Sequence, residues 1–405
     1  MKIITLLFAI AVVTQAHAQS DLWTQADSLN GPPRANAAAF VILDNGWVVS
    51  GYDGFNKKKS MVSYDPLQDD WDDELSLGGA SGDGLNRTSA MSFQAWEYGF
   101  VCMGEGEGFV FSDLWMYNHY TQTWTQMANF PGTARTQGVS FEVDNIGYVG
   151  LGKAGDFATY LKDLWSYDYL TNSWTQVADF PGTARIDAVG AQMGGKAYVG
   201  LGRDATSYPV DFYEYYPAND TWAQKTDFPG TARANACSFA RFPQFFVTTG
   251  EDGLGFLNDT WQYNYFGDTW FQMTDFPGDP RAGAIALEIA NRFYVGTGYG
   301  NGNYYDDFYE YAFAASTSEN DLIEMICYPN PTTDNLFIRL DKNLSNIAIS
   351  VYNISGQQVI SETYFDQLSA TTYSISLNGL VPGEYLIVLT SDNSFLTSQP
   401  VILAK

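Results

Sequence analysis

The chain has 405 residues, 46 of them acidic and only 20 basic, so its formal net charge is −26 at pH 7. Because such a surface repels nucleic-acid phosphates and anionic membranes, we expect neither as a partner. Three cysteines are too few for a disulfide framework, and no His, Cys or carboxylate set has metal-ligand spacing. We therefore expect free buried thiols, no metal and no cofactor.

The N-terminus has the features of a signal peptide. Residues 1–18 combine Lys2, an apolar stretch from Ile3 to Val13, and the small-x-small sequence Ala16-His17-Ala18. No later apolar run reaches the ~18 residues that a membrane-spanning helix needs. The sequence therefore predicts an exported protein without a membrane span.

Residues 19–313 contain a tandem repeat with two fixed internal spacings. Six times, an arginine is followed seventeen residues later by a glycine that ends an apolar run. These pairs are Arg34/Gly51, Arg87/Gly104, Arg135/Gly152, Arg185/Gly202, Arg233/Gly250 and Arg281/Gly298. In five repeats a tyrosine then precedes a tryptophan by seven residues, whereas the sixth has Tyr311 and no tryptophan after it. The missing residue is Trp23, at the start of the mature chain.

Each repeat has the pattern of four short strands between Gly, Asp and Asn turns. A period near fifty residues with four strands is typical of one propeller blade. The repeats resemble kelch repeats over roughly Leu22 to Phe313, although their glycine doublet is altered, as in Gly150-Leu151-Gly152. We therefore predict an all-β protein with a six-bladed kelch-type β-propeller at 19–313, in which the segment around Trp23 supplies the outer strand of the last blade.

Loop lengths indicate which face of this propeller carries a ligand site. Only the connections between the second and third strands, and between successive blades, vary in length, and both kinds emerge on one face. One position there, directly after the repeat glycine, changes chemistry in each blade. Its residues are Tyr52, Glu105, Lys153, Arg203, Glu251 and Tyr299. They are either ligand contacts or ordinary solvated loop residues.

The six repeated arginines have two interpretations. Their five donors can satisfy loop carbonyls as part of the fold. Alternatively, Arg34, Arg87, Arg135, Arg185, Arg233 and Arg281, framed by Lys153 and Arg203, form an anion-attracting mouth, with Tyr52 and Tyr299 offering flat surfaces to a sugar. The repeated aspartates, such as Asp113 and Asp211, are expected to accept hydrogen bonds from loop backbone amides.

Three functions fit these residues. The first is a noncatalytic, monomeric binding protein that presents this face to a glycan or protein. The second is a sugar-acid-processing enzyme, mutarotase-like or lyase-like, in which Glu105 or Glu251 acts as base beside an arginine. The third is a structural or adhesive surface protein without a defined ligand.

The last segment has a different composition. After a polar linker at 314–326, the chain reads YPNP (Tyr328 to Pro331), NxxGQxV from Asn353, LxxGxY from Leu380, and ends at Lys405. Alternating apolar residues and Gly turns predict a small immunoglobulin-like sandwich over 327–405. Cys327 to Lys405 resembles the type A sorting domain of the type IX secretion system. That resemblance implies the secretion machinery as a partner and an extracellular or outer-surface location.

Overall fold

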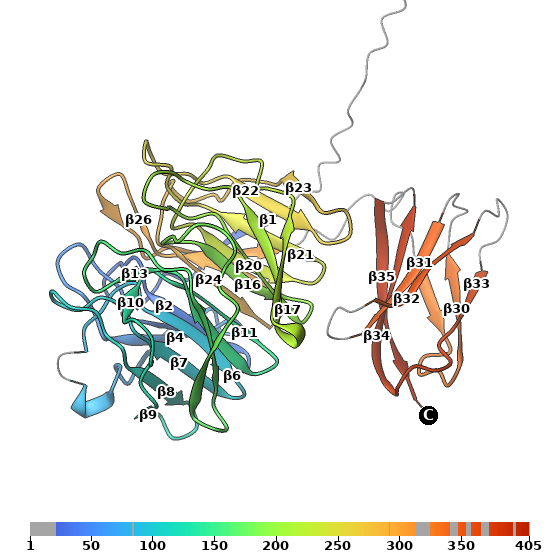
Figure 1. The fold of residues 1–405 in the computed structure, drawn as a ribbon, viewed down its shortest axis with the longest axis horizontal. Helices are drawn as coiled ribbons and strands as arrows, with labels where there is room; N and C mark the ends of the chain where they lie inside the picture. The colour runs from blue at the N-terminus through green and yellow to red at the C-terminus, as the bar shows by residue number, and fades with distance from the viewer. Residues whose placement is uncertain are drawn as a thin grey trace, which may run out of the picture.

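The computed structural model describes residues 22–82, 85–290, 292–312, 325–340, 347–353, 358–365, 372–391 and 394–404. The predicted signal peptide and all but the last two residues of the predicted linker lie outside these residues. The described chain is almost entirely β-structure (Figure 1) and contains no helix long and apolar enough to cross a membrane. All three cysteines are free and buried, as expected.

Six four-stranded antiparallel sheets form the blades of the propeller. From the innermost to the outermost strand, the first three are β2 (Ala38–Ile42), β3 (Asn45–Val49), β4 (Met61–Asp65), β5 (Asp70–Glu74); β6 (Met91–Ala95), β7 (Tyr98–Cys102), β8 (Leu114–Asn118), β9 (Thr123–Gln126); and β11 (Val139–Val143), β12 (Ile146–Gly150), β14 (Leu164–Asp168), β15 (Ser173–Val177). The next three are β16 (Val189–Met193), β17 (Lys196–Gly200), β18 (Phe212–Tyr216), β19 (Thr221–Lys225); β20 (Cys237–Arg241), β21 (Gln244–Thr248), β22 (Thr260–Asn264), β23 (Thr269–Gln272); and β24 (Ile285–Ile289), β25 (Arg292–Gly296), β28 (Phe308–Ala312), β1 (Leu22–Ala26).

Short elements of secondary structure occur in the connections between the strands of the blades. They are the 3-10 turns Gly79–Ser81 and Pro217–Asn219 and the two-residue strands β10 (Arg135–Thr136), β13 (Lys153–Ala154), β26 (Tyr299–Gly300) and β27 (Asn303–Tyr304). The innermost strands contact one another in cyclic order, β2 to β6, β11, β16, β20, β24 and back to β2. The blades therefore surround a central channel.

The sixth blade is completed by the N-terminal strand. β1 runs antiparallel to β28, with Trp23 opposite Tyr311. The Trp23 ring packs edge-on against Tyr311 and Phe276, with centroid separations of 4.8 and 5.3 Å. This pairing joins the two ends of the repeat array. The sixth blade therefore has four strands like the others, and β28 is not left as an exposed edge.

The repeated tryptophans link neighbouring blades. In each blade the indole N–H of the outer-strand tryptophan donates to a backbone carbonyl of the preceding blade or of the connection that leaves it. The pairs are Trp71 with Asp27, Trp124 with Leu75, Trp174 with Ala128, Trp222 with Ala178, Trp270 with Thr226 and Trp23 with Thr274. The tryptophan that the sixth repeat lacks in sequence is therefore replaced in space by Trp23.

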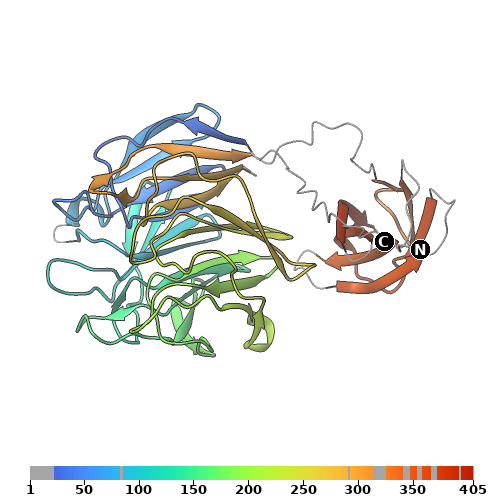
Figure 2. The same cartoon turned by 90° about the horizontal axis from the view of Figure 1, so that it is seen from above.

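The C-terminal segment forms two sheets packed face to face (Figures 1 and 2). One contains β29 (Met325–Tyr328), β30 (Asn335–Leu340) and β33 (Thr372–Ser376); the other contains β32 (Gln358–Phe365), β31 (Ile347–Asn353), β34 (Gly383–Ser391) and β35 (Ser394–Leu403).

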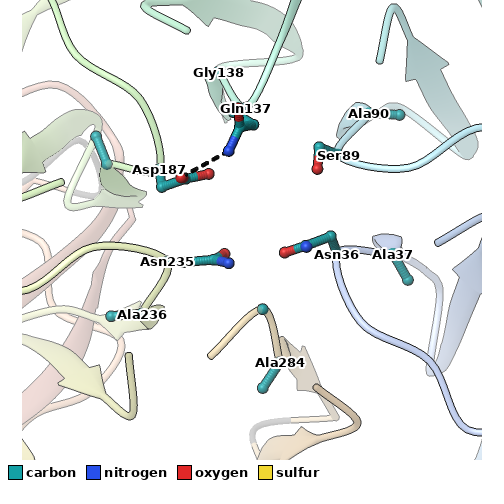
Figure 3. Close-up of a pocket in the computed structure, with 12 residues that line it drawn as sticks. Asn36, Ala37, Ser89, Ala90, Gln137, Gly138, Asp187, Asn235, Ala236 and Ala284 are labelled. Carbon is teal, nitrogen blue, oxygen red and sulfur yellow. Dashed lines mark hydrogen bonds between the residues drawn. The ribbon is translucent and has the colours of Figure 1, made fainter. Parts of the chain in front are cut away.

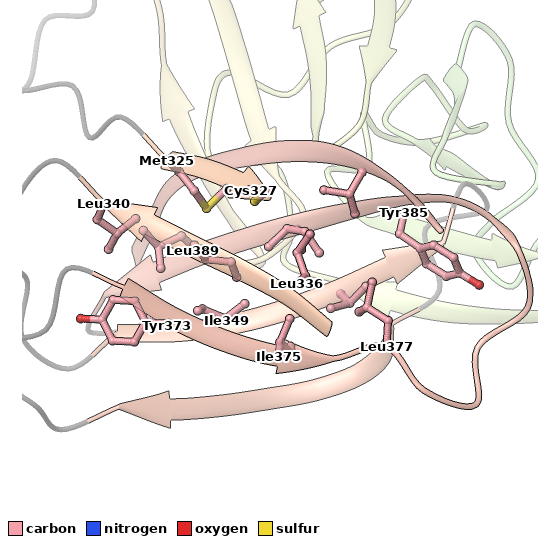
Figure 4. Packing of buried hydrophobic residues seen from close by; sticks show 14 of the residues in the cluster. Met325, Cys327, Leu336, Leu340, Ile349, Tyr373, Ile375, Leu377, Tyr385 and Leu389 are labelled. Carbon is pink, nitrogen blue, oxygen red and sulfur yellow. The ribbon is translucent and has the colours of Figure 1, made fainter. Parts of the chain in front are cut away.

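Apolar side chains from both sheets meet in one core, among them Leu336, Ile349, Ile375 and Leu389 (Figure 4). Every second residue of β30 is buried, as the alternating sequence pattern predicts for a strand with one solvated face. The sandwich begins at Met325, two residues before the boundary expected from the YPNP motif, because β29 pairs Met325 with Leu340.

Candidate functional site

The repeated arginines form a buried layer around the channel. All six side chains are at most 1% exposed. Five form two-pronged ion pairs with a carboxylate, as in Arg233, whose Nη1 and Nη2 lie 2.6 and 2.7 Å from the two Asp259 oxygens. The five pairs are Arg87–Asp113, Arg135–Asp163, Arg185–Asp211, Arg233–Asp259 and Arg281–Asp307.

This geometry contradicts the expected anion-attracting mouth. A fully buried guanidinium whose fork is filled by a carboxylate of its own blade is not accessible to a ligand. Each arginine also donates to the carbonyl just before the repeat glycine, as from Arg233 to Thr249 at 3.0 Å. The five paired arginines therefore belong to the scaffold, and Arg34, which has no carboxylate partner, is buried and donates to the carbonyls of Ser50 and Ser60. The interpretation that the arginines satisfy loop carbonyls is the one that the contacts support.

The repeated aspartates have partners that the sequence analysis did not foresee. They accept from arginine and, in three blades, from an indole N–H, and the carboxylates of Asp163 and Asp259 also accept from a backbone N–H, as expected. Trp115, Trp165 and Trp261 each donate to the aspartate two residues earlier at 2.7 Å. The reason is electrostatic, because a buried guanidinium requires a nearby counter-charge and competes successfully for the carboxylate.

The repeat glycines complete the scaffold layer. Their φ angles lie between +90° and +107°, a region that L-residues rarely occupy. Each glycine N–H donates to the arginine carbonyl of the next blade, and Gly298 closes the circle by donating to Arg34 at 2.7 Å. The repeated arginine and glycine thus connect each blade to its neighbour through a backbone hydrogen bond.

A collar of six non-repeated residues surrounds the channel at the innermost strands. It consists of Asn36, Ser89, Gln137, Asp187, Asn235 and Gly283, each two positions after a repeated arginine. All six have left-handed φ values between 51° and 62°, and each N–H donates to the carbonyl of the preceding member at 2.8–3.2 Å, forming a closed ring. The collar and the small residues behind it line a cavity of about 130 Å³ (Figure 3).

Asp187 is the ionisable member of the collar. Gln137 Nε2 donates to its Oδ2 at 2.9 Å (Figure 3). Desolvation by burial is the main reason that the pKa of Asp187 is raised to about 7; Glu251 adds to the rise, whereas Arg203, the hydrogen bond from Gln137 and Lys153 oppose it. A carboxyl that titrates near neutrality inside a polar cavity can bind a hydrogen-bonding ligand or transfer a proton. The sequence analysis did not identify the collar. It could have been found from the position two residues after each repeated arginine, where the residue type varies from blade to blade.

The six variable residues lie directly beside the collar. Each forms a backbone bridge with the residue that precedes a collar member; examples are Arg203 with Ile186 and Glu251 with Ala234. All six side chains are half-buried. The structure therefore brings the positions singled out from the sequence together at one mouth of the channel.

Charge is distributed unevenly around this mouth. Lys153 and Arg203 stand on adjacent blades and both act electrostatically on Asp187, as does Glu251. Arg203 Nε is buried and has no hydrogen-bond partner among the described residues. By contrast, Glu105 is ion-paired to Lys57 at 2.8 Å, which leaves it less available as a base.

Aromatic rings border the mouth on the other side. Tyr304 lies between Tyr299 and Tyr52, with ring centroids 6.0 and 5.7 Å away, and Phe256 packs edge-on against Tyr299 at 5.3 Å. Burial raises the pKa of Tyr299 to about 12, so its hydroxyl stays protonated at neutral pH. In the part of the chain that the structure covers, no group of three or more His, Cys, Asp or Glu side chains is placed to hold a metal.

Comparison with known proteins agrees with this architecture. Residues 326–403 match the model of the secretion system C-terminal sorting domain, and residues 148–181 match the kelch motif. The solved structure titled "Structure of YjhT" superposes with a TM-score of 0.60 at 15% identity, covering 70% of this chain and 96% of that chain. No curated protein has a significantly similar sequence. The sorting domain indicates type IX secretion, to the cell surface or the extracellular space.

Proposed function

We propose that this secreted kelch-type β-propeller with a C-terminal sorting domain is a noncatalytic binding protein. Its ligand is a glycan or protein that carries an acidic group, and its binding site is the channel mouth. The observation that carries this proposal is the contrast between a scaffold copied in six blades and the two sets of residues at the mouth that are not copied.

The chemistry of the mouth supports an acidic ligand. Lys153 and Arg203 offer two neighbouring cations, and neither forms an ion pair among the described residues. Tyr52 and Tyr299 provide ring faces of the kind on which a sugar stacks. The collar below contributes amide and hydroxyl groups that can hydrogen-bond sugar hydroxyls.

A glycan array probed with the full chain tests this proposal. The double variant Lys153→Ala/Arg203→Ala should weaken binding to acidic glycans by roughly tenfold or more, with the largest difference at low salt. Arg292→Ala is the matched control, because Arg292 is half-exposed in a hairpin on the opposite face. Equal binding by parent and double variant contradicts the proposal, and the absence of any ligand favours the structural or adhesive alternative.

An enzyme is the second candidate, and Asp187 is the observation that favours it. With a pKa near 7 and Arg203 close by, Asp187 fits a general acid or base for a sugar acid better than Glu105 does. Glu251 is the second candidate group, because it acts electrostatically on Asp187. Anomer exchange of free sugar acids, followed by NMR, should be accelerated by the parent and not by Asp187→Asn if this candidate is correct.

A further inference from the structure

A groove opens between the second and third blades, on the face of the propeller opposite the channel mouth. It has a volume of about 360 Å³ and is lined by Trp96, Glu97 and Tyr98, from the hairpin of β6 and β7, and by Tyr169 and Leu170, directly after β14. Trp96 and Leu170 are 51% and 72% exposed, so the groove is open to solvent. The mouth residues lie beyond the other ends of these strands, which makes the groove a separate site.

The groove places one carboxylate beside aromatic rings. Tyr98 and Tyr169 lie next to each other, with ring centroids 5.0 Å apart. Glu97 is held by Tyr120, whose hydroxyl donates to Oε2 at 2.9 Å, and its Oε1 has no hydrogen-bond partner among the described residues. The backbone N–H of Trp96 donates to an asparagine side chain of the third blade at 2.7 Å, which fixes the backbone that carries the exposed indole. Aromatic ring faces and a carboxylate both attract cations.

The charge around the groove favours the same kind of ligand. The second and third blades each contribute two hairpins to this face, at 94–98, 118–122, 142–146 and 168–172. These four segments contain four carboxylates, one histidine and neither lysine nor arginine. The whole chain has a net charge of −26, so its long-range field also attracts positively charged partners.

The contact between the fourth and fifth blades shows how the same position holds a cation in this protein. Lys196 begins β17 as Tyr98 begins β7. Tyr265 directly follows β22, as Tyr169 follows β14. Lys196 is buried, and its Nζ lies 4.9 Å from the centroid of the Tyr265 ring and 2.8 Å from Oε1 of Glu214. Between the second and third blades a tyrosine replaces this lysine, so the chain supplies no ammonium group there and a groove is present instead.

We propose that this groove binds a lysine side chain of a partner protein. Trp96 and Leu170 would pack along the aliphatic stem, which lysine buries against apolar surfaces while its charged end stays polar. The ammonium group would lie over the Tyr169 ring and pair with Glu97. Lys196 makes the same two kinds of contact, although its glutamate comes from another position in its blade. The inference does not rest on the function proposed for the channel mouth, because the groove lies on the other face and attracts the opposite charge.

The capped tripeptide acetyl-Gly-Lys-Gly-amide is the probe for this site. It is titrated into the full chain and its binding is followed by saturation-transfer NMR. A second tripeptide with norleucine in place of lysine keeps the aliphatic stem and removes the charge. We expect the lysine peptide to bind at least about tenfold more tightly, because the ring faces and the carboxylate attract the ammonium group. Equal binding of the two peptides, or binding of neither, overturns the proposal. Tighter binding of maltose would also overturn it and assign the groove to a neutral sugar.

Two variants with matched controls locate the binding. Trp96→Ala and Glu97→Gln should each weaken binding of the lysine peptide at least about fivefold. Leu43→Ala and Asp44→Asn change the equivalent positions in the hairpin of the first blade and should leave binding unchanged. All four residues are exposed, so the thermal midpoint should stay at the parental value in each variant. Equal losses in Glu97→Gln and Asp44→Asn would show that the general negative charge, rather than the groove, attracts the peptide, and would overturn the proposal.

Discussion

The arginine layer and the channel mouth lie within a few residues of each other along every blade, yet they follow opposite rules. In the arginine layer, the same side chain makes the same contacts in five blades and is not accessible to a ligand. At the mouth, one backbone position carries tyrosine, glutamate, lysine or arginine without changing the fold. In this protein, exact repetition marks the scaffold, and departure from repetition marks the candidate site.

The arginine layer itself contains one departure from the repeat, in the first blade. Arg34 keeps the repeated residue but has lost the repeated partner, because Ser60 replaces the aspartate. A position can therefore match the repeat in sequence and still differ in chemistry when its partner changes.

The most severe way to break the scaffold is to open the ring. Deleting residues 22–29 removes β1 and with it Trp23, which leaves β28 paired only with β25, as an exposed edge strand. We expect loss of the cooperative thermal transition and aggregation in size-exclusion chromatography. A truncated protein that melts at the parental midpoint would show that closure contributes little.

Substitution of two arginines in the fourth blade, one in the arginine layer and one at the channel mouth, compares the two regions directly. Arg185→Ala leaves Asp211 without its partner and should lower the free energy of unfolding by about 3 kcal/mol or more. Arg203→Ala removes a half-buried mouth residue and should change it by only about 0.5 kcal/mol. Urea denaturation of both variants measures the difference. Equal losses would mean that the mouth is part of the scaffold.

Replacing Asp187 should have a smaller effect on the free energy of unfolding, and this effect should depend on pH. Its pKa is about 7 in the folded protein and close to 3.9 in an unfolded chain, so the folded state binds more protons between these values. Stability from this group is therefore present below pH 4 and is lost as pH rises to about 7. Relative to Asp187→Asn, the parent should lose up to about 3 kcal/mol of stability between pH 4.5 and pH 8.

Chemical denaturation at several pH values checks this prediction, since comparison with the variant cancels the titration of other groups. Parallel curves for parent and Asp187→Asn would show that the Asp187 carboxyl is solvated in the channel. Its assignment as an acid or base would then lose its support.

Much of the fold could be predicted because it rests on local patterns. The Arg–Gly and Tyr–Trp spacings predicted the all-β kelch propeller, and the YPNP-to-lysine motifs predicted the sorting domain that the family comparison supports. The variable residues at the mouth, from Tyr52 to Tyr299, were also identified as positions, because they follow a glycine whose backbone geometry fixes their place.

What the sequence by itself determined were the features that depend on residues near one another in the chain: strands, turns, blade period and the motifs of the sorting domain. Tertiary structure alone decided that Asp113 and its counterparts neutralise the arginines, that Ser60 leaves Arg34 without a carboxylate partner, and that Asp187 faces the channel. The physical reason is that the sequence gives the type of a charged residue but not whether its side chain is solvated or buried in the folded protein. Only the packing of distant segments fixes its partner, its desolvation and therefore its chemistry.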